Sequence, residues 1–303
     1  MGTTTVNFSP ELGHWLQHNL SRGCAEPDLV QSMRTQGFQP ALAEGLVAAF
    51  ARALREGLAP PLDTLTLEVS DDDGDAGYRY ETPRLPAGPL IRTPDRDIAV
   101  LTRLARPCVA VLESVLSAEE CAQLIALARP RLKPSTVVDP LTGKDTVAGH
   151  RDSEGMFFRL EETPFIARID RRISALMNLP VSHGEGLQVL RYGPAAKTTP
   201  HFDFLVPSNA ANRDSLARSG QRVSTLVAYL NEVEDGGETV FPEAGLSVLP
   251  RQGNAVYFEY ANSLRQVDPL SVHAGAAVHR GEKWALTKWM RERPFVAADF
   301  AVG

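Results

Sequence analysis

The segment TTPHFDF, residues 198–204, places His201 and Asp203 two positions apart among aromatic residues. Residues two apart on a β-strand share one face, so we expect His201 and Asp203 on one side and the phenylalanines Phe202 and Phe204 on the other. A half-buried carboxylate beside an imidazole requires a strong partner, and a metal ion is one such partner. A surface strand with two polar residues facing water is the alternative that this segment alone leaves open.

A third candidate ligand lies further along the chain, in PLSVHAGAAVHRGEKWALTKWM, residues 269–290. Two histidines and one carboxylate form the facial triad of non-haem Fe(II) oxygenases, which leaves coordination positions open for other ligands. His273, which ends a short apolar segment, completes such a triad with His201 and Asp203. A 2-oxo acid bound there would need a cation for its distal carboxylate, and Lys283 can supply it. The alternative for a single lysine is a solvated surface group.

A second histidine and a second lysine compete for these two roles. His279 and Lys288 have nearly the same separation as His273 and Lys283. In a strand that begins at Lys283, however, Lys288 falls on the opposite face, and His279 adjoins the RGE turn, where we expect it to be exposed. The alternation therefore favours His273 and Lys283.

The C-terminal half of the chain has the pattern of an all-β fold. Short apolar segments (LQVLRY, RVSTLVAYL, SVLP, NAVYFEY and KWALTKWM) alternate with glycine-bearing turns such as EDGGE and PRQGN. Many short strands at this spacing indicate a sandwich or barrel. Two helices are expected before them: Ser117 and Glu120 form a capping box, and Thr163 with Pro164 opens a helix with an apolar face opposite Arg168, Arg171 and Arg172. We expect an α+β fold in which helices buttress one face of a jelly roll.

The N-terminal part divides into a helical segment and a linker. Residues 9–57 predict a small bundle of three helices, with Ser9 and Pro10 opening the first and an apolar stripe through Leu46 and Phe50 in the third. Residues 58–97 are rich in proline, glycine and acidic residues and predict a linker with one short strand, TLTLEV. Residues 98–303 then form one domain. The helical bundle is either a recruitment module for a partner or a packing cap on that domain.

Composition excludes several classes of protein. The chain has 303 residues, 43% of them hydrophobic, and a formal net charge of -6, which argues against a nucleic-acid binder. Its three cysteines are far apart, so no disulfide framework is expected, and the cytoplasm is the expected location. No apolar run is long enough to span a membrane, and the N-terminus has no signal-peptide pattern.

The motifs LQVLRYG, PHFDF, TLVAYLNEVEDGGETVFPEAG and HAGAAVHRGEKWALTKWMRERPF together resemble the prolyl 4-hydroxylase family of Fe(II)/2-oxoglutarate dioxygenases. The resemblance covers residues 98–295. It implies a double-stranded β-helix fold supported by N-terminal helices. It also implies that His201, Asp203 and His273 are the iron ligands, that Lys283 binds the distal carboxylate of 2-oxoglutarate, and that Tyr192 and Thr225 contact this cosubstrate.

The same resemblance implies an enzyme of the procollagen-proline 4-dioxygenase type. It would use Fe(II), 2-oxoglutarate and O2, with ascorbate as reductant, to hydroxylate a prolyl residue in a peptide or protein, releasing succinate and CO2. The residues that fall where the family places its substrate side are Arg151, Ser153, Glu185, Thr198 and Trp289. Two alternatives are a hydroxylase of another side chain, free amino acid or small molecule, and a peptide-binding or scaffold protein with a vestigial oxygenase domain.

Two segments deserve separate expectations. At Thr198 the chain departs from the family, which commonly carries a tyrosine there, so we expect a wider or more polar pocket on that side unless another aromatic residue fills it. The polar stretch PSNAANRDSLARSGQ, residues 207–221, predicts a mobile loop that the resemblance would make a lid over a peptide.

Overall fold

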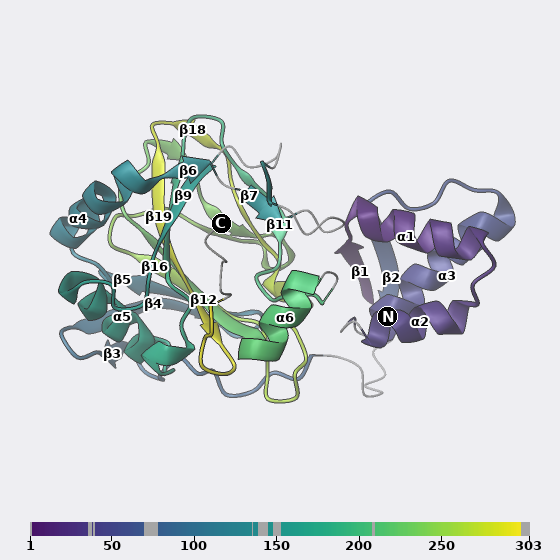
Figure 1. Cartoon of the computed structure of the whole chain (residues 1–303), viewed down its shortest axis with the longest axis horizontal. Coiled ribbons are helices and arrows are strands. Elements are labelled where there is room, and N and C mark those ends of the chain that lie inside the picture. The colour runs from purple at the N-terminus through teal and green to yellow at the C-terminus, as the bar shows by residue number, and fades with distance from the viewer. Residues whose placement is uncertain are drawn as a thin grey trace, which may run out of the picture. The chain divides into compact units, whose positions relative to one another are not determined.

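The computed structural model divides the chain into two compact units (Figure 1). The first comprises residues 1–78 together with 206–208, and the second comprises the other residues. The parts of the chain that the structure describes are residues 2–35, 38, 40–69, 78–134, 136–138, 145–147, 153–207 and 210–297.

The first unit contains three helices and a two-stranded antiparallel ribbon. Its elements are β1 (Gly2–Asn7), α1 (Pro10–Ser21), α2 (Glu26–Thr35), α3 (Pro40–Glu56) and β2 (Thr64–Val69). The hydroxyl of Ser9 accepts a hydrogen bond from the amide of Leu12 and so caps α1, with Pro10 in the first turn. Leu16, Met33 and Leu46 are almost fully buried in a separate core. The three predicted helices are confirmed, whereas the pairing of β1 with β2 was not predicted.

The interval 58–97 is more structured than the expected linker. Its predicted strand is β2, which belongs to the first unit through its pairing with β1. Further on, Glu81 accepts a hydrogen bond from the amide of Ser263 at 3.0 Å, and Arg84 forms an ion pair with Glu259 at 3.0 Å. We call residues 79–86 the strap, because these contacts hold the segment on the second unit. The acidic run 71–73 lies outside the described residues.

The second unit is built on two antiparallel sheets. The large sheet has nine strands in the order β3-β4-β5-β16-β12-β19-β10-β9-β6, and the small sheet has four in the order β11-β17-β14-β15. The strands of the large sheet are β3 (Leu90–Arg92), β4 (Asp97–Leu104), β5 (Cys108–Glu113), β6 (Lys133–Pro134), β9 (Ser153–Phe158), β10 (Leu187–Tyr192), β12 (Arg222–Tyr229), β16 (Ala255–Glu259) and β19 (Lys283–Arg291). Those of the small sheet are β11 (Thr198–His201), β14 (Thr239–Phe241), β15 (Leu246–Val248) and β17 (His273–Gly275). The predicted α+β jelly roll, a double-stranded β-helix, is confirmed.

Short elements complete this unit. The two-stranded pairs are β7 (Thr136–Val138) with β8 (Asp145–Val147) and β13 (Asp235–Gly236) with β18 (Val278–Arg280). The 3-10 turns are η1 (Arg129–Arg131), η2 (Val181–His183), η3 (Pro242–Ala244) and η4 (Pro269–Ser271). No described helix of the chain is both long enough and apolar enough to cross a membrane.

Two helices lie beside the large sheet, on the left of Figure 1: α4 (Ala118–Ala128) and α5 (Pro164–Leu176). The predicted capping box of Ser117 and Glu120 is present at the start of α4, and Thr163 caps α5. One expectation for α5 was wrong. Arg172 does not face water with its neighbours but is 1% exposed, because Asp95 and Glu120 both pair with its guanidinium.

The polar stretch 207–221 is also different from its prediction. It contains a helix, α6 (Ala210–Ser219), whose side chains are mostly exposed. A polar helix of this kind gains little from apolar burial. Its last carbonyls are instead satisfied by arginines: Arg291 donates to the carbonyl oxygen of Ser215 at 2.9 Å, and Arg293 donates to that of Ala217 at 2.7 Å.

Candidate functional site

His201, Asp203 and His273 converge where strands β11 and β17 of the small sheet pair with each other. His201 ends β11 and is the direct partner of His273 at the start of β17. The ligand-type atoms of the three side chains all lie within 4.8 Å of one another. One oxygen of Asp203 lies 3.6 Å from Nε2 of His201, and the other lies 3.6 Å from Nε2 of His273. Two imidazoles and one carboxylate in this arrangement are a donor set suited to Fe(II).

The strand alternation expected for this segment holds only in part. The strand ends at His201, so Asp203 lies in the bend that follows and not on the same strand face. Phe202 and Phe204 do lie together, with ring centroids 4.6 Å apart, and Phe204 packs against the main core. The bend therefore brings the carboxylate beside the imidazole, while the aromatic residues anchor the segment.

Both imidazoles are oriented by a backbone carbonyl two residues earlier. Nδ1 of His201 lies 2.9 Å from the carbonyl oxygen of Thr199, and Nδ1 of His273 lies 3.1 Å from that of Ser271. Since a carbonyl only accepts, each Nδ1 must carry the proton and donate it. Nε2 of each ring then faces Asp203 and is the nitrogen available to bind a metal ion, as in histidine ligands that are oriented through their other ring nitrogen.

Asp203 is buried and held from two sides. The hydroxyl of Thr225 donates to its Oδ2 at 2.7 Å, and Arg222 donates to its backbone carbonyl at 3.3 Å. Burial opposes ionisation of Asp203, but the nearby His273 and His201, the Arg222 charge and the Thr225 hydroxyl outweigh it and hold its pKa below the usual range. The carboxylate is thus kept ionised in a buried place, as a ligand to a cation needs to be.

The competing residues occupy different environments. His279 is exposed on β18, while Lys288 is fully buried and paired with Asp170 at 2.8 Å. Among the described residues, His201, Asp203 and His273 form the one group of three or more metal-ligand side chains that the structure brings together. These placements agree with the strand-parity argument for His273 and Lys283.

Lys283 forms part of a row of three residues across neighbouring strands. Tyr192 on β10 is its direct partner on β19, and Ser153 on β9 is the partner of Tyr192. The ammonium group of Lys283 lies 5.7 Å and 5.5 Å from the ring centroids of Tyr192 and Tyr229 and donates to the carbonyl oxygen of Gly237 at 2.6 Å. Burial lowers the pKa of Lys283 to about 8, although the nearby Glu238 opposes the shift. A buried cation of this kind is well suited to a ligand carboxylate.

The hydroxyl groups of Thr198 and Thr225 both contact other residues of the site. Thr198 is 8% exposed and its hydroxyl donates to that of Tyr192 at 3.4 Å. It therefore adjoins the Tyr192 end of the site. The hydroxyl of Thr225, which the sequence predicts near the cosubstrate, donates to Asp203 and lies 3.0 Å from the hydroxyl of Tyr260. This placement makes Thr225 an orienting partner of the Asp203 carboxylate.

The expected substrate-side residues Glu185 and Trp289 meet at one arginine. Glu185 is 7% exposed, and both of its oxygens accept from Arg222, at 2.7 and 2.8 Å. Arg291 donates to the same carboxylate at 2.9 Å. The Arg222 guanidinium lies 4.2 Å from the ring centroid of Trp289, which is itself 6.4 Å from the ring of the half-exposed Phe157. Glu185 thus anchors two arginines in this structure, and Arg151 lies outside the described residues.

Sequence reasoning missed the residues that support the ligands. Arg222 begins β12 and Tyr260 follows β16, and single polar residues at such places carry no pattern of their own. The arginine at the start of the predicted apolar strand RVSTLVAYL was a usable signal, since a guanidinium that is withdrawn from water requires an anionic partner. Its partner, Glu185, is distant in sequence, and pairing across strands brings the two together.

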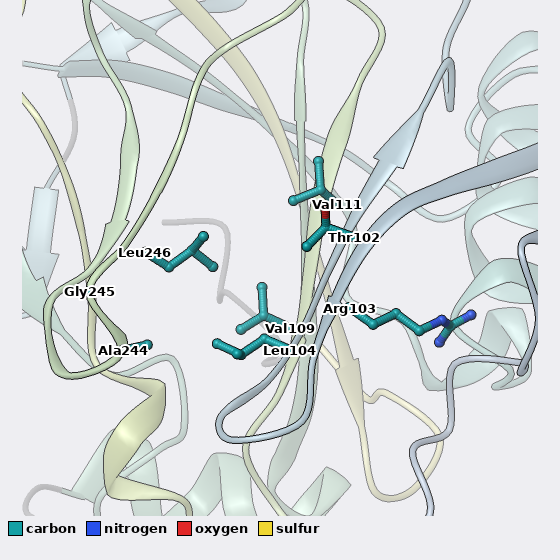
Figure 2. Close-up of a pocket in the computed structure, with 8 residues that line it drawn as sticks. All are labelled: Thr102, Arg103, Leu104, Val109, Val111, Ala244, Gly245 and Leu246. Atoms are coloured by element: carbon teal, nitrogen blue, oxygen red, sulfur yellow. The ribbon is translucent and has the colours of Figure 1, made fainter.

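A separate hollow of the second unit lies between the β4–β5 hairpin and β15 (Figure 2). Leu104, Val109 and Leu246 point into it, whereas the side chain of Arg103 points away. Its lining residues include none of the ligand-type residues described above. The hollow is therefore separate from the group formed by His201, Asp203 and His273.

Comparison with known proteins agrees with this geometry. Residues 187–291 match the model of the 2OG-Fe(II) oxygenase superfamily, and this range contains the triad, Tyr192 and Lys283. The fold, the donor set and this match define the class: the chain is a 2-oxoglutarate- and Fe(II)-dependent dioxygenase.

Individual relatives narrow the class. Probable prolyl 4-hydroxylase 10 of Arabidopsis thaliana is 41% identical over 205 residues, which are 61% of this chain and 69% of the relative. Prolyl 4-hydroxylase 1 of the same plant is 43% identical over 202 residues, or 62% and 70% of the two chains. The chain belongs to the prolyl 4-hydroxylase family. Among solved structures, a viral collagen prolyl hydroxylase from Paramecium Bursaria Chlorella virus-1, in complex with 2OG, aligns with a TM-score of 0.47 and 27% identity over 60% of this chain and 95% of the viral one.

Proposed function

We propose that the second unit hydroxylates a prolyl residue of a peptide or protein, consuming 2-oxoglutarate and O2 and releasing succinate and CO2. The observation that carries this proposal is the convergence of His201, Asp203 and His273 on one point in a chain whose relatives are named prolyl 4-hydroxylases. Hydroxylation of another side chain or of a free amino acid would use the same metal site, so the identity of the substrate needs a direct test.

The residues present fit a bound Fe(II). His201, Asp203 and His273 would hold the ion, which when bound supplies the activation of O2. The carbonyls of Thr199 and Ser271 fix the two imidazoles with Nε2 free. Because these orienting bonds do not involve the metal, the ligands are in place before it binds.

The cosubstrate has a proposed place beside the triad. Lys283 would pair its charge with the distal carboxylate of 2-oxoglutarate, and the hydroxyl of Tyr192 would donate to it. The aromatic rings of Tyr192 and Tyr229 flank the ammonium group and exclude water from it. A charged hydrogen bond shielded in this way is stronger than one in water.

The prolyl residue would enter on the side of Trp289. Its ring, which lies beside Arg222 and near Phe157, offers an apolar surface of the kind that proline rings favour. Ser153, Thr198 and Arg151 belong to the same proposal as substrate contacts, whereas Glu185 would act by holding Arg222. Ascorbate as reductant and a cytoplasmic site of action are also part of the proposal, and both depend on assays in the host.

Turnover of defined peptides tests this function. Purified protein with Fe(II), 2-oxoglutarate and ascorbate is given poly(L-proline), or the same length of peptide with alanine at every position. We expect succinate release to rise only with the proline peptide, and mass spectrometry to show the gain of oxygen atoms on proline. If a broad set of proline-containing peptides gains no oxygen while another compound stimulates succinate release, the prolyl substrate is wrong and the dioxygenase class stands.

A further inference from the structure

β19 carries two buried lysines that face opposite sides of the large sheet. Lys283 lies in the row with Tyr192, whereas Lys288 points to the side of α5. The Lys288 ammonium is completely buried and makes two short contacts: it donates to Oδ1 of Asp170 at 2.8 Å and to the backbone carbonyl of Glu185 at 2.6 Å. A buried ion pair is a weak source of stability, because desolvation offsets the attraction between its charges. The hydrogen bond to the Glu185 carbonyl gives this ion pair a role besides stability, which is to position Glu185.

The hydrogen bond from Lys288 holds the backbone of Glu185, while its carboxylate remains free to bind other groups. The Glu185 amide donates to the carbonyl oxygen of Trp289 at 2.9 Å, so its backbone is tied to β19 at both its amide and its carbonyl. From this fixed backbone the side chain reaches Arg222 and Arg291. The position of both guanidinium groups therefore depends on where β19 holds Glu185.

Arg222 links Glu185 to the segment of Asp203 and to Trp289. It donates to the backbone carbonyl of Asp203 at 3.3 Å, and its guanidinium carbon lies over the Trp289 ring, 4.2 Å from the ring centroid. Lys288 is thus connected, through Glu185 and Arg222, both to the segment that carries a proposed metal ligand and to the proposed substrate platform. Its own side chain lies on the opposite face of β19 from the ring of its neighbour Trp289.

A glycine makes room for this arrangement. A Cβ atom at Gly184 would lie 2.3 Å from Cε of Lys288 and 2.4 Å from its ammonium nitrogen. The backbone of Gly184 has φ -80, which any residue can adopt, so the absence of a side chain is needed for space and not for conformation. Even a methyl group there would displace the lysine.

We propose that Lys288, neutralised by Asp170, is a positioning residue that sets Trp289 and Arg222 for the substrate by holding the carbonyl of Glu185. The proposal rests on the proposed function only for the choice of ligand, a proline-containing peptide. It assigns the pair a role in substrate binding, whereas a purely structural pair would affect folding alone.

The first test separates positioning from stability. Asp170→Asn combined with Lys288→Met removes both charges. The asparagine keeps a side-chain oxygen that can accept the hydrogen bond that the Glu161 amide donates to Asp170 at 2.8 Å. We expect this double variant to melt near the wild type and to bind 2-oxoglutarate normally. Its dissociation constant for poly(L-proline), measured by calorimetry with Mn(II) in place of Fe(II), should rise roughly tenfold or more, as for the loss of an orienting partner. Wild-type melting together with wild-type peptide affinity would overturn the proposal.

The second test keeps both charges. Gly184→Ala should move the ammonium and weaken poly(L-proline) binding to a similar extent, and Gly193→Ala is its matched control, because a Cβ there meets nothing within 4 Å. If the double variant does not fold, this pair of glycine variants decides the question. Equal peptide affinity of the two glycine variants would contradict the proposal.

A third readout does not depend on the proposed substrate. If the wild-type protein binds no proline peptide, the proposed function has failed, and the crystal structure of Gly184→Ala still tests the positioning. We expect the Glu185 carboxylate, the Arg222 guanidinium and the Trp289 ring to shift relative to the wild type. Unchanged positions of all three would mean that Lys288 does not set them.

Discussion

His273 and His279 are separated by a short turn, yet they have very different surroundings. His273 is 6% exposed and its Nδ1 donates to a backbone carbonyl, while His279 is exposed. We expect His273→Ala to lose Fe(II) binding and succinate production, and His279→Ala to retain both. Metal content of the anaerobically loaded proteins is the direct measurement. Loss of iron in the His279 variant alone would mean that the third ligand is misassigned.

Lys283 gives a pH dependence whose sign can be worked out. Its charged form is the one that binds a carboxylate, and its pKa is lowered to about 8 by burial. Affinity for 2-oxoglutarate should therefore fall as the pH rises above about 8, and Lys283→Met should have a weak affinity without this dependence. Anaerobic calorimetry between about pH 7 and about pH 9, on either side of that pKa, measures the affinity for 2-oxoglutarate. An affinity of the wild type that does not change over this range contradicts the assignment.

The effect of Lys283 on stability has the opposite pH dependence from its effect on 2-oxoglutarate affinity. Its pKa in the folded protein lies below the ordinary lysine pKa of 10.5, so the unfolded chain binds more protons between the two values. The contribution of Lys283 to the free energy of unfolding should therefore become more favourable as the pH rises through this window. The difference between wild type and Lys283→Met in urea unfolding at several pH values isolates this contribution. If the free energy of unfolding of the wild type, relative to that of Lys283→Met, instead falls as the pH rises through this window, the assignment is contradicted.

At the scale of single elements, α5 shows why a sequence pattern can mislead. Its apolar positions predicted a buried face, and Ile166, Ile169 and Ile173 are fully buried as expected. Arg172 was assigned to water because arginines usually face solvent, but the acidic partners that bury it come from distant segments. Information of that kind is tertiary, and no local periodicity contains it.

A pair of arginine variants tests this difference within one helix. Arg172→Met leaves Asp95 and Glu120 without their buried partner and should lower the free energy of unfolding by about 3–5 kcal/mol. Arg171→Met removes an exposed pair with Glu161 and should cost about 1 kcal/mol or less. Urea denaturation of both variants makes the comparison, and equal losses would show that burial does not distinguish these pairs.

Other elements were predictable because their signals are local. The capping box, the proline-opened helices and the alternating strands depend on residues within a few positions of each other. The triad was also predictable, since its residue types and the family motifs mark it. The contacts of Thr225 with Asp203 and Tyr260 were not predicted, because the three residues lie on different segments. The helix α6 was missed because it lacks the apolar stripe that identifies most helices.

On the scale of the whole molecule, the boundary between the units lies elsewhere than composition suggested. The sequence placed the catalytic domain at residues 98–303, whereas the structure assigns residues from Arg79 onward to the second unit. The strap and β3 explain the difference, because Arg84 pairs with Glu259 and Leu90 pairs with Ala99. Proline and glycine content indicated an irregular segment but not the unit to which it is attached.

Two truncations test this boundary. A chain that begins at Arg79 keeps the strap and β3, and we expect it to stay folded, bind Fe(II) and turn over a peptide at a rate near that of the whole chain. One that begins at residue 98 loses both and leaves the buried Glu259 carboxylate without Arg84, which should lower its melting temperature markedly. Melting curves and iron content compare the two. Equal stability would mean that the strap contributes nothing to the second unit.

The two carbonyls that orient His201 and His273 have a consequence for metal competition. Since hydrogen bonds within the protein, and not the ion, orient the two imidazoles, the site offers the same nitrogens and carboxylate to every divalent metal that reaches it. Later transition metals bind such ligands more tightly than Fe(II) does. Zinc, nickel or copper would therefore displace iron wherever they are freely available, and the protein would lose its activity without any change in fold. The supply of metal in the cell, more than the affinity of the site, would decide how much of this protein is active.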